Sequence, residues 1–272
     1  MAVYSDQHMH SLHSFDSKAK MTDMAEAAIK NKLSHITFTE HVDFDFPESE
    51  EVPKGSFECN IDSYLYDLLC LREKYGNDLA IGFGVEVGLK ESAIEKNKNL
   101  VSSYDFDLVI ASQHLLNNID TYDPKCFEGL TDKQAISGYF EELIKNIKAF
   151  NNFDVLGHMD YVVRTLPGGE SVYKPSDYLD YIDEILSYLI RNQKSLEINT
   201  SALNKGFKNP NPHIDIVKRY KEKGGELITI GSDAHAPENV GGNFAAANDI
   251  LINAGFKYMT VYCKREPQML KL

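Results

Sequence analysis

Histidines and carboxylates follow the short apolar runs of this chain, where side chains from neighbouring strands can meet and bind a metal ion. The first such stretch is Asp6-Gln7-His8-Met9-His10, which comes after the apolar Val3-Tyr4. Residues two apart in a strand point to the same face, so the side chains of Asp6, His8 and His10 should project together. Two imidazoles and a carboxylate at one strand end form a set of metal ligands. A pair of histidines alone is more often solvated, so metal binding requires further ligands in the same structural position.

Other apolar runs are followed by residues of the same kind. His41 comes after 35–39, Glu86 after 80–85, His114 after 108–111, His158 after 155–157, and Asp233 and His235 after 227–230. Apolar periodicity predicts these runs as strands, with further strands at 195–199 and 258–262, and predicts helices at 21–32, 61–75, 91–103, 132–150, 176–192, 212–223 and 243–253. The polar stretches 42–58 and 116–130 are irregular and predict long loops. Strands therefore alternate with helices along the whole chain.

Seven or eight strands separated by helices predict an α/β fold with a parallel sheet. In a (β/α) barrel the carboxyl ends of all strands open on one face, and that face holds the active site. A doubly wound open sheet would gather only the residues near its switch point. Because a barrel brings all the strand-end residues together, we expect residues 1–272 to form a single barrel domain.

Six of the nine histidines lie at the predicted strand ends: His8, His10, His41, His114, His158 and His235. A single histidine in such a place is more often a hydrogen-bonded core residue. Six of them together with Glu86 and Asp233 instead favour metal binding. His35 begins a strand and His213 lies in the first turn of a helix, so both are expected to be structural or solvated. His13 is close enough to the expected site to leave both interpretations open.

Composition narrows the classes of protein to which the chain can belong. With 272 residues, of which 43% are hydrophobic, it can bury a substantial core. It contains neither an apolar run approaching the length of a transmembrane helix nor an N-terminal signal sequence. Cys59, Cys70, Cys126 and Cys263 have no metal-site spacing and are expected to be reduced thiols, as in a cytoplasmic protein. The net charge of −13 argues against nucleic-acid binding and permits a small polar substrate held by local cations, including metal ions.

The combined motifs resemble those of the polymerase-and-histidinol-phosphatase (PHP) family. They are Asp6-Gln7-His8-Met9-His10 with Asp16, Thr39-Glu40-His41, Gly84-Val85-Glu86, Ser112-Gln113-His114, Gly157-His158-Met159-Asp160 and Gly231-Ser232-Asp233-Ala234-His235. The stretches Glu197-Ile198-Asn199-Thr200-Ser201 and Asn204-Lys205-Gly206 are similar to the family's histidinol-phosphate phosphatase branch. The resemblance implies a distorted (β/α)7 barrel that hydrolyses L-histidinol phosphate to L-histidinol and phosphate in histidine biosynthesis.

The resemblance also implies three divalent transition metal ions. His8, His10, Glu86 and Asp233 would hold the first; Glu86 would bridge to a second, completed by His114 and His158; Asp16, His41 and His235 would hold a third. Imidazole and carboxylate ligands suit Zn, Mn or Fe and do not choose among them. Spacing alone does not distinguish Asp16 from an ordinary turn residue.

Charge arithmetic supports a phosphate substrate at such a site. Three divalent ions bring six positive charges, and the carboxylates of Asp16, Glu86 and Asp233 bring three negative ones, so the local surplus can bind a phosphate dianion. A water molecule that bridges two ions can be a hydroxide at neutral pH and can attack phosphorus in line. The leaving alkoxide needs a proton, which Asp233, His235 or a metal-bound water could supply.

Four other residues or stretches are candidates for supporting roles. Arg164, six residues after His158, could bind phosphate oxygens bidentately or be an exposed loop residue. Lys205 is a second candidate for the phosphate, and Asp6 for orienting a ligand histidine. Residues 43–46 could face the amine and imidazole of the substrate or form a solvated loop.

Two other functions are compatible with the ligand pattern. One is a different PHP phosphoesterase, acting on another small phosphomonoester or as a nuclease, for which the acidic composition is unfavourable. The other is a barrel that binds metal without catalysis. Adjacent metal sites with room for water favour hydrolysis over binding alone. The sequence identifies neither the native metal nor the oligomeric state.

Overall fold

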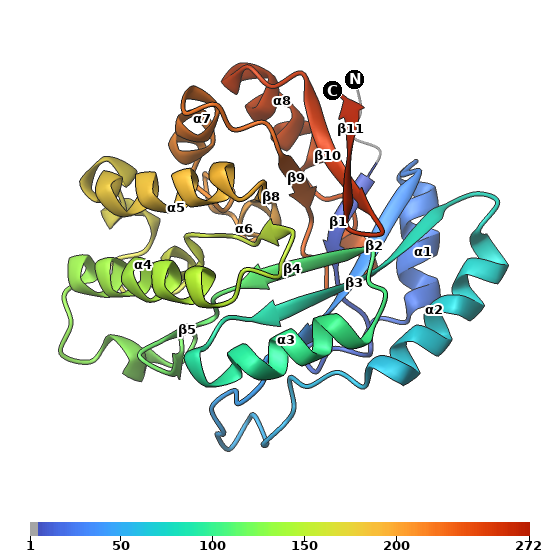
Figure 1. Ribbon diagram of the computed structural model, residues 1–272, viewed down its shortest axis with the longest axis horizontal. Helices are drawn as coiled ribbons and strands as arrows, with labels where there is room; N and C mark the ends of the chain where they lie inside the picture. The colour runs from blue at the N-terminus through green and yellow to red at the C-terminus, as the bar shows by residue number, and fades with distance from the viewer. Residues whose placement is uncertain (1–4) are drawn as a thin grey trace.

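Seven parallel strands form a nearly closed barrel in the computed structural model, which describes residues 5–272 (Figure 1). Their order around the sheet follows the chain: β1 (Ser5–Met9), β2 (His35–Val42), β3 (Ala80–Gly88), β4 (Leu108–Ser112), β7 (Val155–Leu156), β8 (Ser195–Asn199) and β9 (Ile228–Gly231). The predicted (β/α)7 barrel is confirmed. Val3-Tyr4, predicted to be strand, lies outside the described residues.

The first and last strands close the barrel through the segment that follows β9. Asp233 N–H donates to the carbonyl of His8 at 2.8 Å, and His10 N–H donates to the carbonyl of Ala234 at 2.9 Å. The carboxylate of Asp6 accepts hydrogen bonds from the backbone N–H and the hydroxyl of Ser232, at 2.9 and 2.5 Å. Residues 8–10 and 232–235 are therefore held side by side.

Helices surround the strands and bury their apolar faces against them (Figure 1). They are α1 (Met21–Lys30), α2 (Ile61–Tyr75), α3 (Ile94–Ser103), α4 (Asp132–Ala149), α5 (Leu179–Arg191), the short α6 (Ser201–Asn204), α7 (Ile214–Glu222) and α8 (Phe244–Ala254). Helix α4 begins with a capping box, in which Thr131 and Gln134 each satisfy a free backbone N–H of the other. No helix in the described part of the chain is long and apolar enough to cross a membrane.

Two predicted strands are longer than expected, and one lies outside the barrel. The predicted strands 35–39 and 80–85 extend to Val42 and Gly88, so His41 and Glu86 lie within strands, as register neighbours of β2 and β3. The predicted strand 258–262 is β10 (Tyr258–Cys263), which pairs with β11 (Glu266–Lys271) as an antiparallel hairpin. The predicted loop 116–130 contains part of a small hairpin, β5 (Leu115–Leu116) with β6 (Ile119–Asp120).

The β10–β11 hairpin packs against the amino ends of the barrel strands. Tyr262 N–H donates to Gln7 Oε1 at 3.0 Å, and the Tyr262 hydroxyl lies 2.9 Å from Ser195 Oγ. Arg265, in the hairpin turn, donates to both carboxylate oxygens of Asp154, just before β7. The opposite end of the barrel, where the carboxyl ends of the strands meet, is left for the residues with metal-ligand chemistry.

Candidate metal centre

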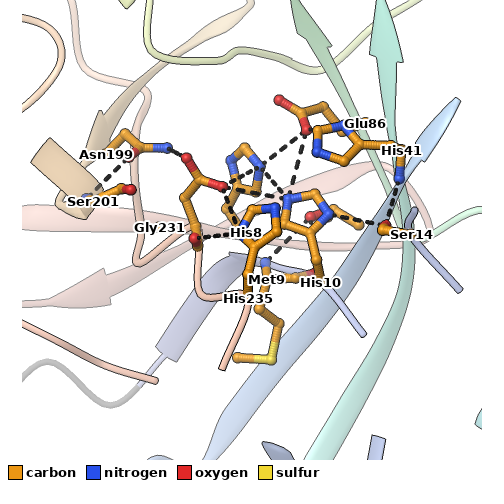
Figure 2. A network of polar contacts seen from close by, with 12 residues as sticks. His8, Met9, His10, Ser14, His41, Glu86, Asn199, Ser201, Gly231 and His235 are labelled. Atoms are coloured by element: carbon orange, nitrogen blue, oxygen red, sulfur yellow. Dashed lines mark hydrogen bonds and ion pairs between the residues drawn. The ribbon is translucent and has the colours of Figure 1, made fainter. Parts of the chain in front are cut away.

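The carboxylate of Glu86 lies against a cluster of histidines, of which Figure 2 labels His8, His10 and His41. Its Oε1 atom is 3.0 Å from His158 Nε2 and 3.4 Å from His114 Nε2. Its Oε2 atom is 2.9 Å from His41 Nδ1, 3.4 Å from His8 Nε2 and 3.6 Å from His10 Nε2. One fully buried side chain thus faces five imidazoles from four separate segments.

Asp233 and Asp16 extend the cluster toward the surface. Asp233 Oδ1 is 3.4 Å from His10 Nε2 and 3.8 Å from His8 Nε2. Asp16 Oδ2 is 3.1 Å from His235 Nε2 and 3.6 Å from His41 Nε2. The structure therefore brings all nine predicted metal ligands into one connected group, including Asp16, for which spacing gave the weakest argument.

In the described part of the chain, four overlapping sets of ligand atoms are each close enough to share an ion, with all atoms of a set within 4.8 Å of one another. The sets are His8–His10–Asp233, His8–Glu86–His158, His41–Glu86–His114 and His10–His41–His235. Glu86 belongs to two sets, as expected of a bridging ligand. His8, His10 and His41 also belong to two sets each. The geometry therefore supports adjacent metal ions, but it does not assign each ligand to one ion.

Two carboxylates outside the predicted ligand set orient the imidazoles. Glu197 Oε1 accepts a hydrogen bond from His8 Nδ1 at 2.6 Å, and Asp43 Oδ1 accepts one from His114 Nδ1 at 2.7 Å. A carboxylate that accepts from one ring nitrogen leaves the lone pair of the other nitrogen for a metal. The backbone N–H of His158 also donates to Glu197 Oε2 at 2.8 Å.

The predicted role of Asp6 in orienting a histidine ring is wrong. Its carboxylate accepts from Ser232, from the backbone N–H of Gly241 at 3.0 Å and from that of His8 at 3.3 Å, and it bonds no imidazole. Burial raises its pKa to about 6, against the lowering effect of these hydrogen bonds. Asp6 supports the backbone that presents Asp233. Glu197 could have been found from strand periodicity, because Glu197 and Asn199 are two apart and share a face of β8.

The protonation of the cluster fits metal binding. Burial lowers the pKa of His10 to about 3, which keeps this imidazole neutral. At His114, burial opposes protonation, but Asp43 and Glu86 overcome it and raise the pKa to about 10. Within residues 5–272, the buried atoms His41 Nδ1, Glu86 Oε2 and His235 Nε2 make no hydrogen bond. The neutral imidazole of His10 has a lone pair free for a metal ion, and at His114 a divalent transition metal would compete with the proton for the same carboxylate-rich surroundings.

A cavity of about 290 Å³ opens above the cluster and brings Arg164 and Lys205 to the same site. Arg164 donates to Asn211 Oδ1 at 2.7 Å, Asn199 Oδ1 at 2.8 Å and Asp233 Oδ2 at 3.2 Å, and its side chain is only 3% exposed. Arg164 is therefore not an exposed loop residue. Lys205 lies at the rim, where its Nζ donates to the hydroxyl of Tyr122 at 3.0 Å.

The three remaining histidines lie outside the cluster. His13 pairs with Asp67 on α2 at 3.0 Å, His35 lies beside Ser5 and Gln7, and His213 caps the start of α7. The stretch 43–46 is not simply a solvated loop, because Asp43 is buried beneath His114. Asp45 is partly exposed and pairs with Lys96.

Comparison with known proteins places these features in a family. The PHP domain family matches residues 6–201. A probable histidinol-phosphatase of Clostridium acetobutylicum is 35% identical over 93% of this chain and 94% of that protein. The histidinol-phosphatase of Lactococcus lactis is 29% identical over 94% of this chain and 93% of that protein. A crystal structure of the L. lactis enzyme complexed with zinc, L-histidinol and phosphate has a TM-score of 0.89, covers 97% of this chain and 98% of its own, and is 28% identical.

Proposed function

This chain belongs to the PHP family, and from that premise we propose that it is a metal-dependent phosphatase that hydrolyses L-histidinol phosphate to L-histidinol and phosphate. The observation that carries this proposal is the convergence of six imidazoles and three carboxylates beneath a cavity of about 290 Å³, large enough for a small phosphomonoester. Similarity over nearly the full length to the L. lactis enzyme, which binds zinc, L-histidinol and phosphate, supports the substrate. We further propose that residues 1–272 act as a single catalytic domain.

We propose that the nine converging residues hold up to three divalent transition metal ions, with Zn, Mn and Fe all compatible with the ligands. These ligands are His8, His10, Asp16, His41, Glu86, His114, His158, Asp233 and His235. Ions held there supply Lewis-acid stabilisation of a phosphate group and activate water at neutral pH. Glu86 would bridge two ions, while Glu197 and Asp43 fix the rings of His8 and His114.

Arg164 is positioned to bind the phosphate from the side of the cavity. Its three observed hydrogen bonds use three of the five N–H donors of a guanidinium, which leaves two for phosphate oxygens. Asn199 and Asn211 fix the plane of the group before substrate arrives. Lys205 at the rim would add a second positive charge. Asp233 and His235 both line the cavity, and each is a candidate to protonate the leaving alkoxide.

Replacing Arg164 by alanine is expected to weaken phosphate binding while metal remains bound. A lost charge-assisted hydrogen bond costs roughly 1.5–3 kcal/mol, which corresponds to a fall of about ten- to hundredfold in kcat/KM. Steady-state kinetics with L-histidinol phosphate and metal analysis of the same sample check this result. R191A, at the exposed end of α5, is the matched control and should behave as wild type. An R164A enzyme with unchanged kcat/KM would remove Arg164 from the substrate site.

The proposed substrate is tested by comparing kcat/KM for L-histidinol phosphate, another small phosphomonoester and a single-stranded oligonucleotide in one buffer with one metal. We expect L-histidinol phosphate to be strongly preferred, because the metal ions and Arg164 bind the phosphate while the acidic protein attracts the substrate's ammonium group. A chain with net charge −13 should repel a long polyanion. A preference for the oligonucleotide would indicate a nuclease, and equal rates on both monoesters would exclude a dedicated histidinol-phosphate phosphatase.

A further inference from the structure

His10 is held by neither of the two carboxylates that orient His8 and His114. Its ring is fully buried, and its Nε2 lies 3.1 Å from His8 Nε2, 3.4 Å from Asp233 Oδ1 and 3.6 Å from Glu86 Oε2. Its other ring nitrogen, Nδ1, lies 3.3 Å from the hydroxyl of Ser14. Figure 2 shows Ser14 beside His10 and His41, at the edge of the cluster. Which ring nitrogen of His10 carries the proton therefore depends on whether Ser14 Oγ accepts a hydrogen bond from Nδ1 or donates one to it.

The other hydrogen bonds of the Ser14 hydroxyl determine whether it donates to His10 Nδ1 or accepts from it. A serine hydroxyl has one hydrogen to donate and two lone pairs that accept. Ser14 Oγ donates to Glu40 Oε2 at 2.5 Å and accepts from the backbone N–H of His41 at 3.0 Å. Glu40 also accepts the N–H and the hydroxyl of Ser11, at 3.0 and 2.5 Å. With three donors directed at its two oxygens, Glu40 acts as the acceptor, so the single hydrogen of Ser14 is committed to Glu40. The remaining lone pair of Ser14 can only accept from His10 Nδ1–H.

We propose that Glu40 is a positioning residue, which acts through Ser14 to hold His10 with its proton on Nδ1 and its Nε2 lone pair free for a metal ion. The proposal rests on the proposed function, because it treats His10 as a metal ligand. Glu40 is fully buried in β2, and its observed hydrogen bonds come from the loop after β1. The Ser14–Glu40 pair thus does for His10 what Glu197 does directly for His8.

Two serine variants separate this role from simple anchoring of the loop. Ser11 and Ser14 each donate a hydroxyl to the Glu40 carboxylate at 2.5 Å, and both are buried. Of the two hydroxyls, only that of Ser14 lies within hydrogen-bond distance of His10. S11A and S14A each remove one hydroxyl bonded to Glu40, whereas S14A also removes the acceptor of the His41 backbone N–H and, of the two variants, is the one that removes the acceptor for His10 Nδ1–H, so the His10 tautomer is the deciding readout. S14T keeps a hydroxyl at the position and serves as the conservative variant.

The experiment measures the tautomer of His10 and the affinity of the protein for Zn²⁺ in the absence of substrate. Nitrogen-15 NMR of protein labelled at histidine reports which ring nitrogen carries the proton, and competition with a chelator reports Zn²⁺ affinity. We expect Nδ1–H for His10 in wild type, S11A and S14T. In S14A and E40A the tautomer should become mixed, and Zn²⁺ binding should weaken about 10- to 100-fold, the usual effect of losing such a partner.

Thermal unfolding of each variant verifies that it is folded. If S14A matched S11A in both tautomer and Zn²⁺ affinity, Glu40 and Ser14 would be structural anchors and the proposal would be overturned. Neither readout involves the substrate. Failure to hydrolyse L-histidinol phosphate would therefore overturn the proposed function while leaving the tautomer result to decide the role of Glu40.

Discussion

Replacing Glu86 by alanine is expected to abolish metal binding and phosphatase activity together. Its carboxylate lies between 2.9 and 3.6 Å from five histidine nitrogens, so it is placed to share its oxygens between two ions. Loss of an outer-shell partner of a metal ligand already costs about 10- to 100-fold, and loss of a bridging ligand should cost more than that. Metal analysis after desalting and phosphate release from L-histidinol phosphate measure the two effects on one preparation.

The control for this variant is E95A, which removes a carboxylate from the surface of α3. Glu95 is 79% exposed and pairs with Lys98 in the next turn, and exposed pairs of this kind contribute little to stability. E95A should therefore retain full metal content and full activity. An E86A protein that kept near-normal turnover would show that Glu86 is not the bridging ligand.

Replacing Gly231 by alanine should damage the same centre without removing a ligand. Gly231 ends β9, and a Cβ placed there would lie 2.5 Å from Glu197 Oε1 and closer still to the Cβ of His8. The added methyl would separate the His8–Glu197 pair, which is joined by a 2.6 Å hydrogen bond. We expect a loss of stability of about 1–3 kcal/mol from overpacking and a fall of about 10- to 100-fold in metal affinity.

G138A is the matched glycine control for G231A. Gly138 lies within α4, where an added Cβ would meet only Leu116 Cδ1, at an ordinary contact distance of 3.7 Å. Alanine is favoured over glycine in a helix interior by roughly 0.5–1 kcal/mol, so G138A should be at least as stable as wild type. Denaturant unfolding and chelator competition compare the two variants. Equal metal affinity in G231A and wild type would contradict the close packing of β9 against His8.

The barrel and eight of the nine candidate ligands could be predicted because both depend on local patterns, whereas Asp16 was indicated by the family resemblance. Alternating apolar runs and helical periods indicate parallel strands. A polar residue at the end of such a strand can be placed on the catalytic face without knowing which distant residues lie near it. His114 and His158 follow their strands as expected. His41 and Glu86 lie within theirs, because the ladder between β2 and β3 continues through the ligands to Val42 and Val87.

Which histidine each orienting carboxylate contacts could not be read from local patterns, even where the face of its strand could. Glu197 contacts a histidine 189 residues away, and Asp43 contacts one 71 residues away. These pairings depend on how the barrel closes and on the path of the loop after β2. Asp6 shows the same limit, since it was expected to orient a ligand histidine. The fold directs its carboxylate to Ser232 and Gly241 instead.

The central claim is that this cluster of histidines and carboxylates is a multinuclear metal centre that hydrolyses L-histidinol phosphate. The most direct measurement determines transition metal per chain and the rate of phosphate release from L-histidinol phosphate on the same sample, before chelation, after chelation and after adding Zn²⁺ or Mn²⁺. The account predicts more than one metal equivalent per chain, loss of activity in step with loss of metal, and recovery when metal is restored. Full activity in a preparation verified to be metal-free would contradict it.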